Sequence, residues 1–171
     1  MKEVELKFLD INVEDVKGKL EKLGAELKYD TYIESYPFIS DEFHGYNSDK
    51  KYLRVRKVDD DVEITYKDPA ITSDMTAREE INLRVDSYEE AIKLIEKLGF
   101  EKGEVFRKHR VHYELGSIHF ELDTLDHIPT YLEIETETED EMKKVCVELE
   151  LDILHGKKGT IVEIFPEKFR G

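Results

Sequence analysis

Charged residues occupy every second position in most of the extended segments of this chain, and this alternation constrains the fold more than any other feature. The opening segment, KEVELKF, places Glu3, Glu5 and Lys7 on one side and three apolar residues on the other. Side chains two positions apart on a strand point in the same direction. Such a segment is either a strand of an open sheet with one solvent face, or part of the wall of a barrel with a charged interior.

The same alternation recurs along the chain, and charges of like sign gather on particular segments. Cations share a face in KYLRVRKV and in KHR, and carboxylates share a face in the segment 130–137. These positions are Arg54 and Arg56, Lys108 and Arg110, and Glu133, Glu135 and Glu137. Two further faces mix the two signs: Glu63, Thr65 and Lys67; and Arg78, Glu80, Asn82 and Arg84. His119, Glu121 and Asp123 share another face.

Segregated charges of this kind predict a site for a metal ion and an anion. Like charges on one strand face repel each other unless something of opposite sign lies between them. Paired carboxylates suit Mg²⁺ or Mn²⁺, whereas arginine and lysine suit phosphate oxygens. The formal net charge of the chain is -15, so cations must be concentrated inward to capture an anion. We therefore favour a closed barrel with a polar lumen over an open antiparallel sheet with solvent faces.

Period and capping signals predict an α+β fold with about eight strands. Helices are expected from Asn12 to Leu23, from Ser87 to Leu98 and from Thr138 to about residue 151, each opened by a capping residue. A loop is expected over 37–50, and the chain is expected to end in a short strand, GTIVEIF. The other expected strands cover 2–9, 25–36, 51–58, 61–68, 78–85, 104–115, 117–124 and 130–137.

One short repeat divides the chain into two similar halves. The letters EKLG occur at 21–24 and again at 96–99, each time at the end of a helix that follows a charged strand. The offset aligns Glu5 with Glu80, so a second charged strand is expected to partner the first.

Length and composition exclude several functions. The 171 residues suit a single domain, 1–171. The acidic balance argues against nucleic-acid binding, and the chain shows neither a membrane-spanning apolar run nor a signal peptide. Cys146 is the only cysteine, which predicts a reducing, cytoplasmic location and a buried thiol. Abundant lysine and glutamate without glutamine resemble thermophile composition.

These motifs together resemble the CYTH superfamily, whose members are also called triphosphate tunnel metalloenzymes. EVELK fits the Glu-x-Glu-x-Lys signature, and YLRVR, ITYKDP, REEIN, KHR and LDTLDHIPTYLEIE resemble later family motifs in the same order. IPTYLEIE departs from the family pattern because it lacks the usual Leu-Gly. YDTYI and the overall length are similar to the class IV adenylyl cyclase branch.

The resemblance implies a closed eight-stranded antiparallel β-barrel, or tunnel, with helices packed on its outside. It implies Mg²⁺ or Mn²⁺ held by Glu3, Glu5 and Glu135, helped by Asp123 or Glu133. It implies a triphosphate bound by Lys7, Arg54, Arg56, Lys67, Lys108 and Arg110. The catalytic set is then Glu3, Glu5, Lys7, Arg56, Lys108 and Glu135, with Arg78 and Glu80 in support.

Three functions stay open from the sequence. A cyclase would convert ATP to cyclic AMP and pyrophosphate, and the branch resemblance favours it. A triphosphatase would hydrolyse tripolyphosphate, thiamine triphosphate or a nucleoside triphosphate, and a third alternative is a non-catalytic polyphosphate-binding or nucleotide-binding module. The expected partner is a small triphosphate, without nucleic acid or membrane, and a homodimer is left open. His112 and His119 fall on lumen-side positions and are interpreted as polar wall residues, because the histidines show no metal-ligand spacing.

Overall fold

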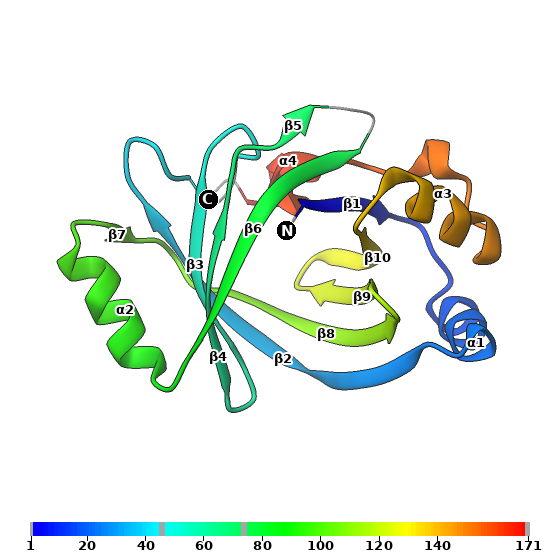
Figure 1. The fold of residues 1–171 in the computed structure, drawn as a ribbon, viewed down its shortest axis with the longest axis horizontal. Helices are drawn as coiled ribbons and strands as arrows, with labels where there is room; N and C mark the ends of the chain where they lie inside the picture. The colour runs from blue at the N-terminus through cyan, green and yellow to red at the C-terminus, as the bar shows by residue number, and fades with distance from the viewer. Residues whose placement is uncertain (1, 45–46, 73–74, 170–171) are drawn as a thin grey trace.

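Eight antiparallel strands close into a barrel in the computed structural model, which describes residues 2–44, 47–72 and 75–169 (Figure 1). The order around the barrel is β1-β10-β9-β8-β2-β3-β4-β6, and β6 pairs with β1 to complete the ring. This confirms the predicted fold class. The barrel strands are β1 (Lys2–Phe8), β2 (Glu26–Ile39), β3 (Tyr52–Val58), β4 (Asp61–Lys67), β6 (Thr76–Val85), β8 (Phe106–Leu115), β9 (Ile118–Leu125) and β10 (Ile128–Thr136).

Strand β1 closes the barrel because it pairs with β10 on one side and with β6 on the other. Its register sets Glu5 opposite Glu135 and sets Glu3 opposite Arg78. Two short strands lie off the ring: β5 (Ile71–Thr72) pairs with β6, and β7 (Glu101–Lys102) pairs with β2. The closure therefore brings charged residues from the start, middle and end of the chain onto adjacent strands.

The two halves suggested by the EKLG repeat appear in the topology. The first half runs β1, α1 (Val13–Leu23), β2, β3, β4, and the second runs β6, α2 (Tyr88–Lys97), β8, β9, β10. Each pairing within one half has a counterpart in the other, since β2–β3 matches β8–β9 and β3–β4 matches β9–β10. Between the halves, β1–β10 matches β6–β4. The contacts β1–β6 and β2–β8 join equivalent strands of the two halves.

The three predicted helices form where their caps indicated. Asn12 caps α1 by accepting a hydrogen bond from the Asp15 amide, and Gly24 ends the helix with φ 81°, a conformation that costs glycine little. Ser87 caps α2 in the same way, and α3 (Glu139–Glu148) begins with a capping box between Thr138 and Glu141. All three lie outside the barrel (Figure 1).

The final predicted strand, GTIVEIF, is wrong. The structure has a short helix there, α4 (Ile161–Ile164), flanked by the 3₁₀ turns Ile153–His155 and Pro166–Lys168. Thr160 and Glu163 form a capping box that starts α4, and this Thr-x-x-Glu signal outweighs the β-branched run between them. Ile161 packs with Leu125 and Tyr131, so α4 covers one end of the barrel.

Apolar side chains on the outward faces of the strands form the cores under the helices. Cys146 belongs to α3 and faces the larger core, where burial raises the pKa of its thiol to about 11. This confirms the prediction of a buried, structural thiol. Among the described residues, no helix has the length and apolar character needed to cross a membrane.

Candidate active site

The barrel lumen contains two adjoining cavities of opposite charge. The inner cavity, beside α4, has a volume of about 110 Å³ and is lined by seven lysines or arginines against four glutamates. These cations are Lys7, Arg54, Arg56, Lys67, Arg78, Lys108 and Arg110, and the glutamates are Glu5, Glu121, Glu133 and Glu135. The excess of cations makes the inner cavity suited to an anion.

The outer cavity extends toward the β8–β9 turn, and its charge is reversed. It has a volume of about 540 Å³ and is lined by seven glutamates against four cations. Glu121, Glu135 and three of the cations line both cavities, so the two are continuous. The glutamates are Glu3, Glu63, Glu80, Glu114, Glu121, Glu135 and Glu137, and the cations are Arg54, Arg56, Lys67 and Arg84.

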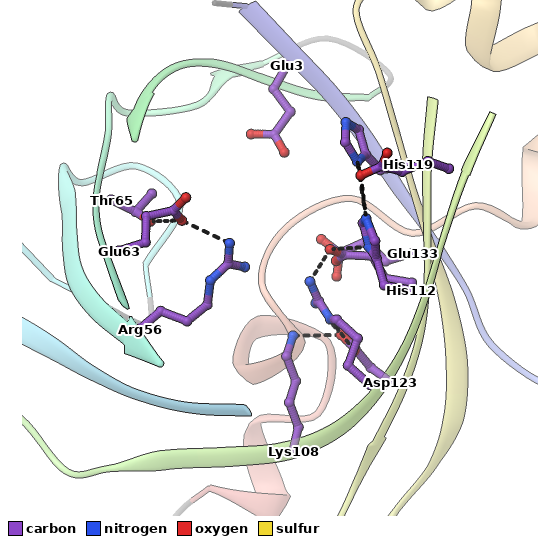
Figure 2. A network of polar contacts seen from close by, with 12 residues as sticks. Glu3, Arg56, Glu63, Thr65, Lys108, His112, His119, Asp123 and Glu133 are labelled. Carbon is purple, nitrogen blue, oxygen red and sulfur yellow. Dashed lines mark hydrogen bonds and ion pairs between the residues drawn. The ribbon is translucent and has the colours of Figure 1, made fainter. Parts of the chain in front are cut away.

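The structure brings together the residues that strand parity selected. Every proposed site residue lines one of the two cavities except Asp123, whose side chain is fully buried in the wall. Figure 2 shows Arg56 reaching into the lumen from the side opposite His112, with Glu3 at one edge and Lys108 at the other.

Two groups of three carboxylates share Glu135. Ligand oxygens of Glu3, Glu5 and Glu135 lie within 4.8 Å of one another, as do those of Glu121, Glu133 and Glu135. Among the described residues, the Glu135 carboxylate forms no hydrogen bond or salt bridge. Burial, Glu121 and Glu3 raise its pKa well above the ordinary value, because a negative charge on Glu135 would be compensated least by the lumen; without a metal the protonated form is favoured.

Glu3 and Glu5, the other two carboxylates of the group Glu3, Glu5 and Glu135, have pKa values shifted in opposite directions. Burial is the largest effect on Glu3, and together with Glu80 it raises the pKa of Glu3 to about 7, although Lys67 opposes the rise. Burial also acts on Glu5, but Lys7, Arg78 and Lys67 outweigh it and lower its pKa to about 2. The Glu5 carboxylate lies 3.1 Å from Lys7 Nζ and 3.4 Å from an Arg78 nitrogen.

Most lumen cations are held by carboxylates of neighbouring strands. Lys7 also contacts Glu133 at 3.2 Å, and Lys67 contacts Glu3 at 3.1 Å. Arg56 pairs with Glu63 at 2.8 Å. These pairs keep the side chains extended into the lumen without a ligand, at the cost that an incoming anion must compete with the carboxylates.

Arg54 is the exception among the lumen cations. In the described part of the chain it makes no salt bridge; its Nε donates to the Thr65 hydroxyl at 3.3 Å, and its guanidinium lies 5.7 Å from the Tyr52 ring centre. An arginine without a carboxylate partner in a confined cavity is a strong anion receptor.

Asp123 holds cations in place. Its two oxygens accept bonds of 2.6 Å from Arg110 Nε and Nη2, and Lys108 Nζ lies 2.6 Å from Oδ2. Tyr131 donates to the same carboxylate at 3.2 Å. With both oxygens engaged, Asp123 is placed to position Lys108 and Arg110, and Glu133 is better placed than Asp123 beside Glu135.

Glu121 is a lumen residue that the sequence analysis left out of the site. It pairs with Arg110 and belongs to the second carboxylate group. Its parity with Asp123 on one strand face was the available signal. That signal was not enough, because only the β8–β9 register shows that Glu121 lies beside Arg110 and His112.

The carboxylate groups fit a hard divalent cation. Mg²⁺ and Mn²⁺ prefer carboxylate oxygens and water, and Glu135 offers an uncompensated charge within reach of two neighbours in each group. Glu3, Glu5 and Glu135 would hold such an ion at the boundary between the cation-rich and acid-rich cavities.

A closed antiparallel barrel with carboxylates and phosphate-type cations in its lumen defines a class of metal-dependent anion-binding proteins. Comparison places the chain within that class: the CYTH domain family matches residues 1–163, and the chain belongs to this family. CYTH triphosphate tunnel enzymes are metal-dependent and act as adenylyl cyclase-like enzymes or triphosphatases.

Individual relatives cover nearly the whole chain. A Methanocaldococcus jannaschii protein named "Putative adenylate cyclase MJ0240" is 29% identical over 151 residues, which cover 87% of this chain and 86% of that protein. The PH1012 protein of Pyrococcus horikoshii OT3 is 31% identical, with a TM-score of 0.75 over 94% of this chain and 98% of that one. HpAC1 from Hippeastrum shares the fold at 14% identity, with a TM-score of 0.63 over 98% and 95% of the two chains.

Proposed function

We propose that the protein is a metal-dependent enzyme that cyclises ATP to cyclic AMP and pyrophosphate in the barrel lumen. The observation that carries this proposal is the composition of the inner cavity, where a cation-rich wall adjoins an apolar part. A polyphosphate needs only the cations. The apolar part offers a surface for a nucleobase, and it consists of Ile33, Pro37, Phe106, Ile161 and Val162.

The cations of the chain would bind the triphosphate and stabilise the leaving group. In this reaction the ribose 3′-hydroxyl loses its proton to water, its oxygen forms a bond to the α-phosphorus, and the bond from that phosphorus to the β-phosphate oxygen breaks. Arg54, Arg56 and Arg110 would bear on the negative charge that develops on pyrophosphate. Burial and Arg110 lower the pKa of Lys108. Burial opposes the charged form of Lys7 and Lys67 as well, but neighbouring carboxylates outweigh it and raise the pKa of both lysines. Of the three, Lys108 would therefore give a proton to the leaving oxygen most readily.

Glu3, Glu5 and Glu135 would hold the metal against the triphosphate. A bound Mg²⁺ or Mn²⁺ supplies charge stabilisation at a phosphoryl oxygen and eases ionisation of the attacking hydroxyl. The carboxylates orient that charge toward the inner cavity, because Glu5 and Glu135 line it directly.

Triphosphate hydrolysis is the second candidate, and the outer cavity favours it. That cavity, of about 540 Å³, is lined by Glu3 and Glu135 and would give water room beside these carboxylates. Water would attack the terminal phosphorus, and the bond to the bridging oxygen would break. The structure of HpAC1, a protein of the same fold, is described as revealing a dominant triphosphatase activity.

Product analysis separates the two reactions. We expect purified protein incubated with ATP and Mg²⁺ or Mn²⁺ to form cyclic AMP and pyrophosphate, measured by chromatography and phosphorus NMR. A parallel incubation with tripolyphosphate should then yield little orthophosphate. ADP and orthophosphate from ATP, or orthophosphate from tripolyphosphate, would establish the triphosphatase instead. Absence of every product with either metal, in protein that still binds tripolyphosphate, would establish a binding module.

A further inference from the structure

The β8–β9 hairpin carries a cluster of two histidines and one glutamate at the outer end of the lumen. The cluster adjoins the carboxylates assigned to Mg²⁺ or Mn²⁺, since His119 is the cross-strand partner of Glu135, but it shares no residue with them. Ligand atoms of His112, Glu114 and His119 lie within 4.8 Å of one another. We propose that these three side chains bind a transition-metal ion of the Zn²⁺ class. Figure 2 shows His119 and His112 in succession along the barrel wall.

Three specific atoms of the cluster form a nearly equilateral triangle. His112 Nε2 lies 3.2 Å from Glu114 Oε1, His119 Nδ1 lies 3.4 Å from His112 Nε2, and His119 Nδ1 lies 3.6 Å from Glu114 Oε1. Tetrahedral Zn²⁺ with bonds of about 2.0–2.1 Å sets its ligand atoms about 3.3–3.4 Å apart. The three atoms therefore already lie at the corners of one face of a zinc coordination tetrahedron, and the fourth position remains for water or a ligand.

The hairpin fixes these ligands before any metal arrives. His112 and Glu114 are two positions apart on β8 and share a face, and Glu114 is the direct cross-strand partner of His119. The strands are joined by a tight turn in which Gly116 has φ 62°, a conformation that favours glycine. Tyr29 stacks on the His112 ring with centres 4.8 Å apart and planes 8° apart, which fixes the ring plane.

The contacts around the cluster leave the ligand atoms available. His112 Nδ1 is buried and forms no hydrogen bond with any described residue, but Glu121 Oε1 lies 3.5 Å away. A neighbouring carboxylate favours the tautomer with the proton on Nδ1, which leaves the Nε2 lone pair facing Glu114 and His119. Lys28 lies 3.5 Å from the other oxygen of Glu114, so Oε1 keeps its place in the triangle.

Imidazole ligands distinguish this cluster from the carboxylate groups. Two nitrogens and one carboxylate suit Zn²⁺, whereas Mg²⁺ prefers oxygen. The surrounding cavity has more carboxylates than cations, which attracts a positive ion, and the half-exposed His119 side chain opens the cluster to solvent. Without a metal, one proton shared among the three ligand atoms can form only some of the hydrogen bonds between them.

Zinc binding to the full chain in excess Mg²⁺ tests the proposal, because Mg²⁺ occupies oxygen sites and competes poorly for imidazole. We expect one Zn²⁺ per chain in a titration against a chromophoric chelator. His119→Ala and Glu114→Gln should each weaken Zn²⁺ binding at least about tenfold, the lower end of what loss of an outer-sphere partner costs. Nitrogen NMR of the histidine side chains should identify His112 Nε2 and His119 Nδ1 as the metal-bound atoms.

His109→Ala is the matched control, since His109 lies on the same strand but contacts Asp30 at 2.8 Å on the other face. It should bind Zn²⁺ as the wild type does. Circular dichroism in chelator checks that each variant folds, and the nearly isosteric Glu114→Gln provides the test if His119→Ala does not fold. Equal Zn²⁺ affinity in wild type and the folded variants, or no bound Zn²⁺ in the wild type, would overturn the proposal. Because the readout is binding alone, it does not depend on the enzymatic activity.

Discussion

Glu135→Gln is expected to abolish metal-dependent turnover while leaving the metal-free protein at least as stable as the wild type above neutral pH. Glu135 is the one residue common to both carboxylate groups, so its loss removes charge from either arrangement of the metal. Loss of a single group that stabilises charge in a transition state costs about 10²–10³ in rate, and we expect at least that. Turnover with Mg²⁺ or Mn²⁺ and thermal melts in chelator measure the two effects.

The sign of the stability change follows from the raised pKa of Glu135. An exposed glutamate ionises near pH 4.3, whereas burial, Glu121 and Glu3 raise the pKa of Glu135 well above that. The folded state therefore holds a proton that the unfolded chain has lost, and wild-type stability falls as pH rises through this window. Glutamine has no proton to lose, so the advantage of Glu135→Gln over the wild type should grow as the pH rises above the pKa of an unfolded glutamate, about 4.3.

Glu5→Gln should behave in the opposite way in the metal-free protein. Lys7, Arg78 and Lys67 outweigh burial and lower the pKa of Glu5 to about 2, so ionised Glu5 stabilises the fold above its unfolded pKa, and that stability is lost as pH falls toward 2. Its replacement should therefore lower the melting temperature at neutral pH. Glu79→Gln, an exposed residue on β6, should change neither stability nor turnover. If Glu135→Gln kept most of the metal-dependent activity, Glu135 would not be a metal ligand.

Strand parity predicted which side chains face the lumen, because a two-residue period assigns every position of a strand to one face. It could not predict how charges balance across strands. Parity alone groups Glu5 with other carboxylates, and like charges on neighbouring positions repel each other. In the folded barrel the Arg78 side chain instead reaches Glu5, and Glu135 is left as the carboxyl group that no cation of the described residues holds.

The C-terminal segment shows a second limit of predicting structure from sequence. Its β-branched residues favoured a strand, yet Thr160 and Glu163 satisfy the first backbone amides of α4, and Glu163 also accepts hydrogen bonds from the amide and hydroxyl of Ser48. This contact joins residues 115 positions apart in sequence. Local propensity carries no information about such a partner, and here the tertiary contact and the cap together decide the conformation.

Arg54→Met is expected to remove most of the stabilisation that tripolyphosphate and Mg²⁺ give to the wild type. A ligand at hundredfold excess over its Kd stabilises the folded state by about 2.7 kcal/mol, or about 5–11 °C in the melting temperature of a domain of this size. Arg54 has no salt bridge among the described residues, whereas Arg56 already pairs with Glu63. An anion therefore reaches Arg54 without displacing a carboxylate, a difference that the sequence YLRVR does not reveal.

Arg110→Met provides the contrast, because Arg110 holds the buried carboxylates Asp123 and Glu121. Removing one partner of a buried ion pair costs about 3–5 kcal/mol, so this variant should melt well below the wild type without any ligand. Arg54→Met leaves no carboxylate unpaired and should melt near or above the wild type. Thermal denaturation of both variants, with and without tripolyphosphate and Mg²⁺ at physiological salt, measures the two effects separately.

Arg107→Met controls for a general loss of positive charge. Arg107 lies on β8 next to Lys108 but is exposed and pairs with Glu34, and such surface pairs contribute about 0–1 kcal/mol. Its melting temperature and its tripolyphosphate shift should both match the wild type. Monophosphate should shift the wild type far less than tripolyphosphate, because it spans only part of the cation-rich wall. Equal tripolyphosphate shifts in wild type and Arg54→Met would show that the unpaired arginine does not bind the anion, and the inner cavity would lose its place as the triphosphate site.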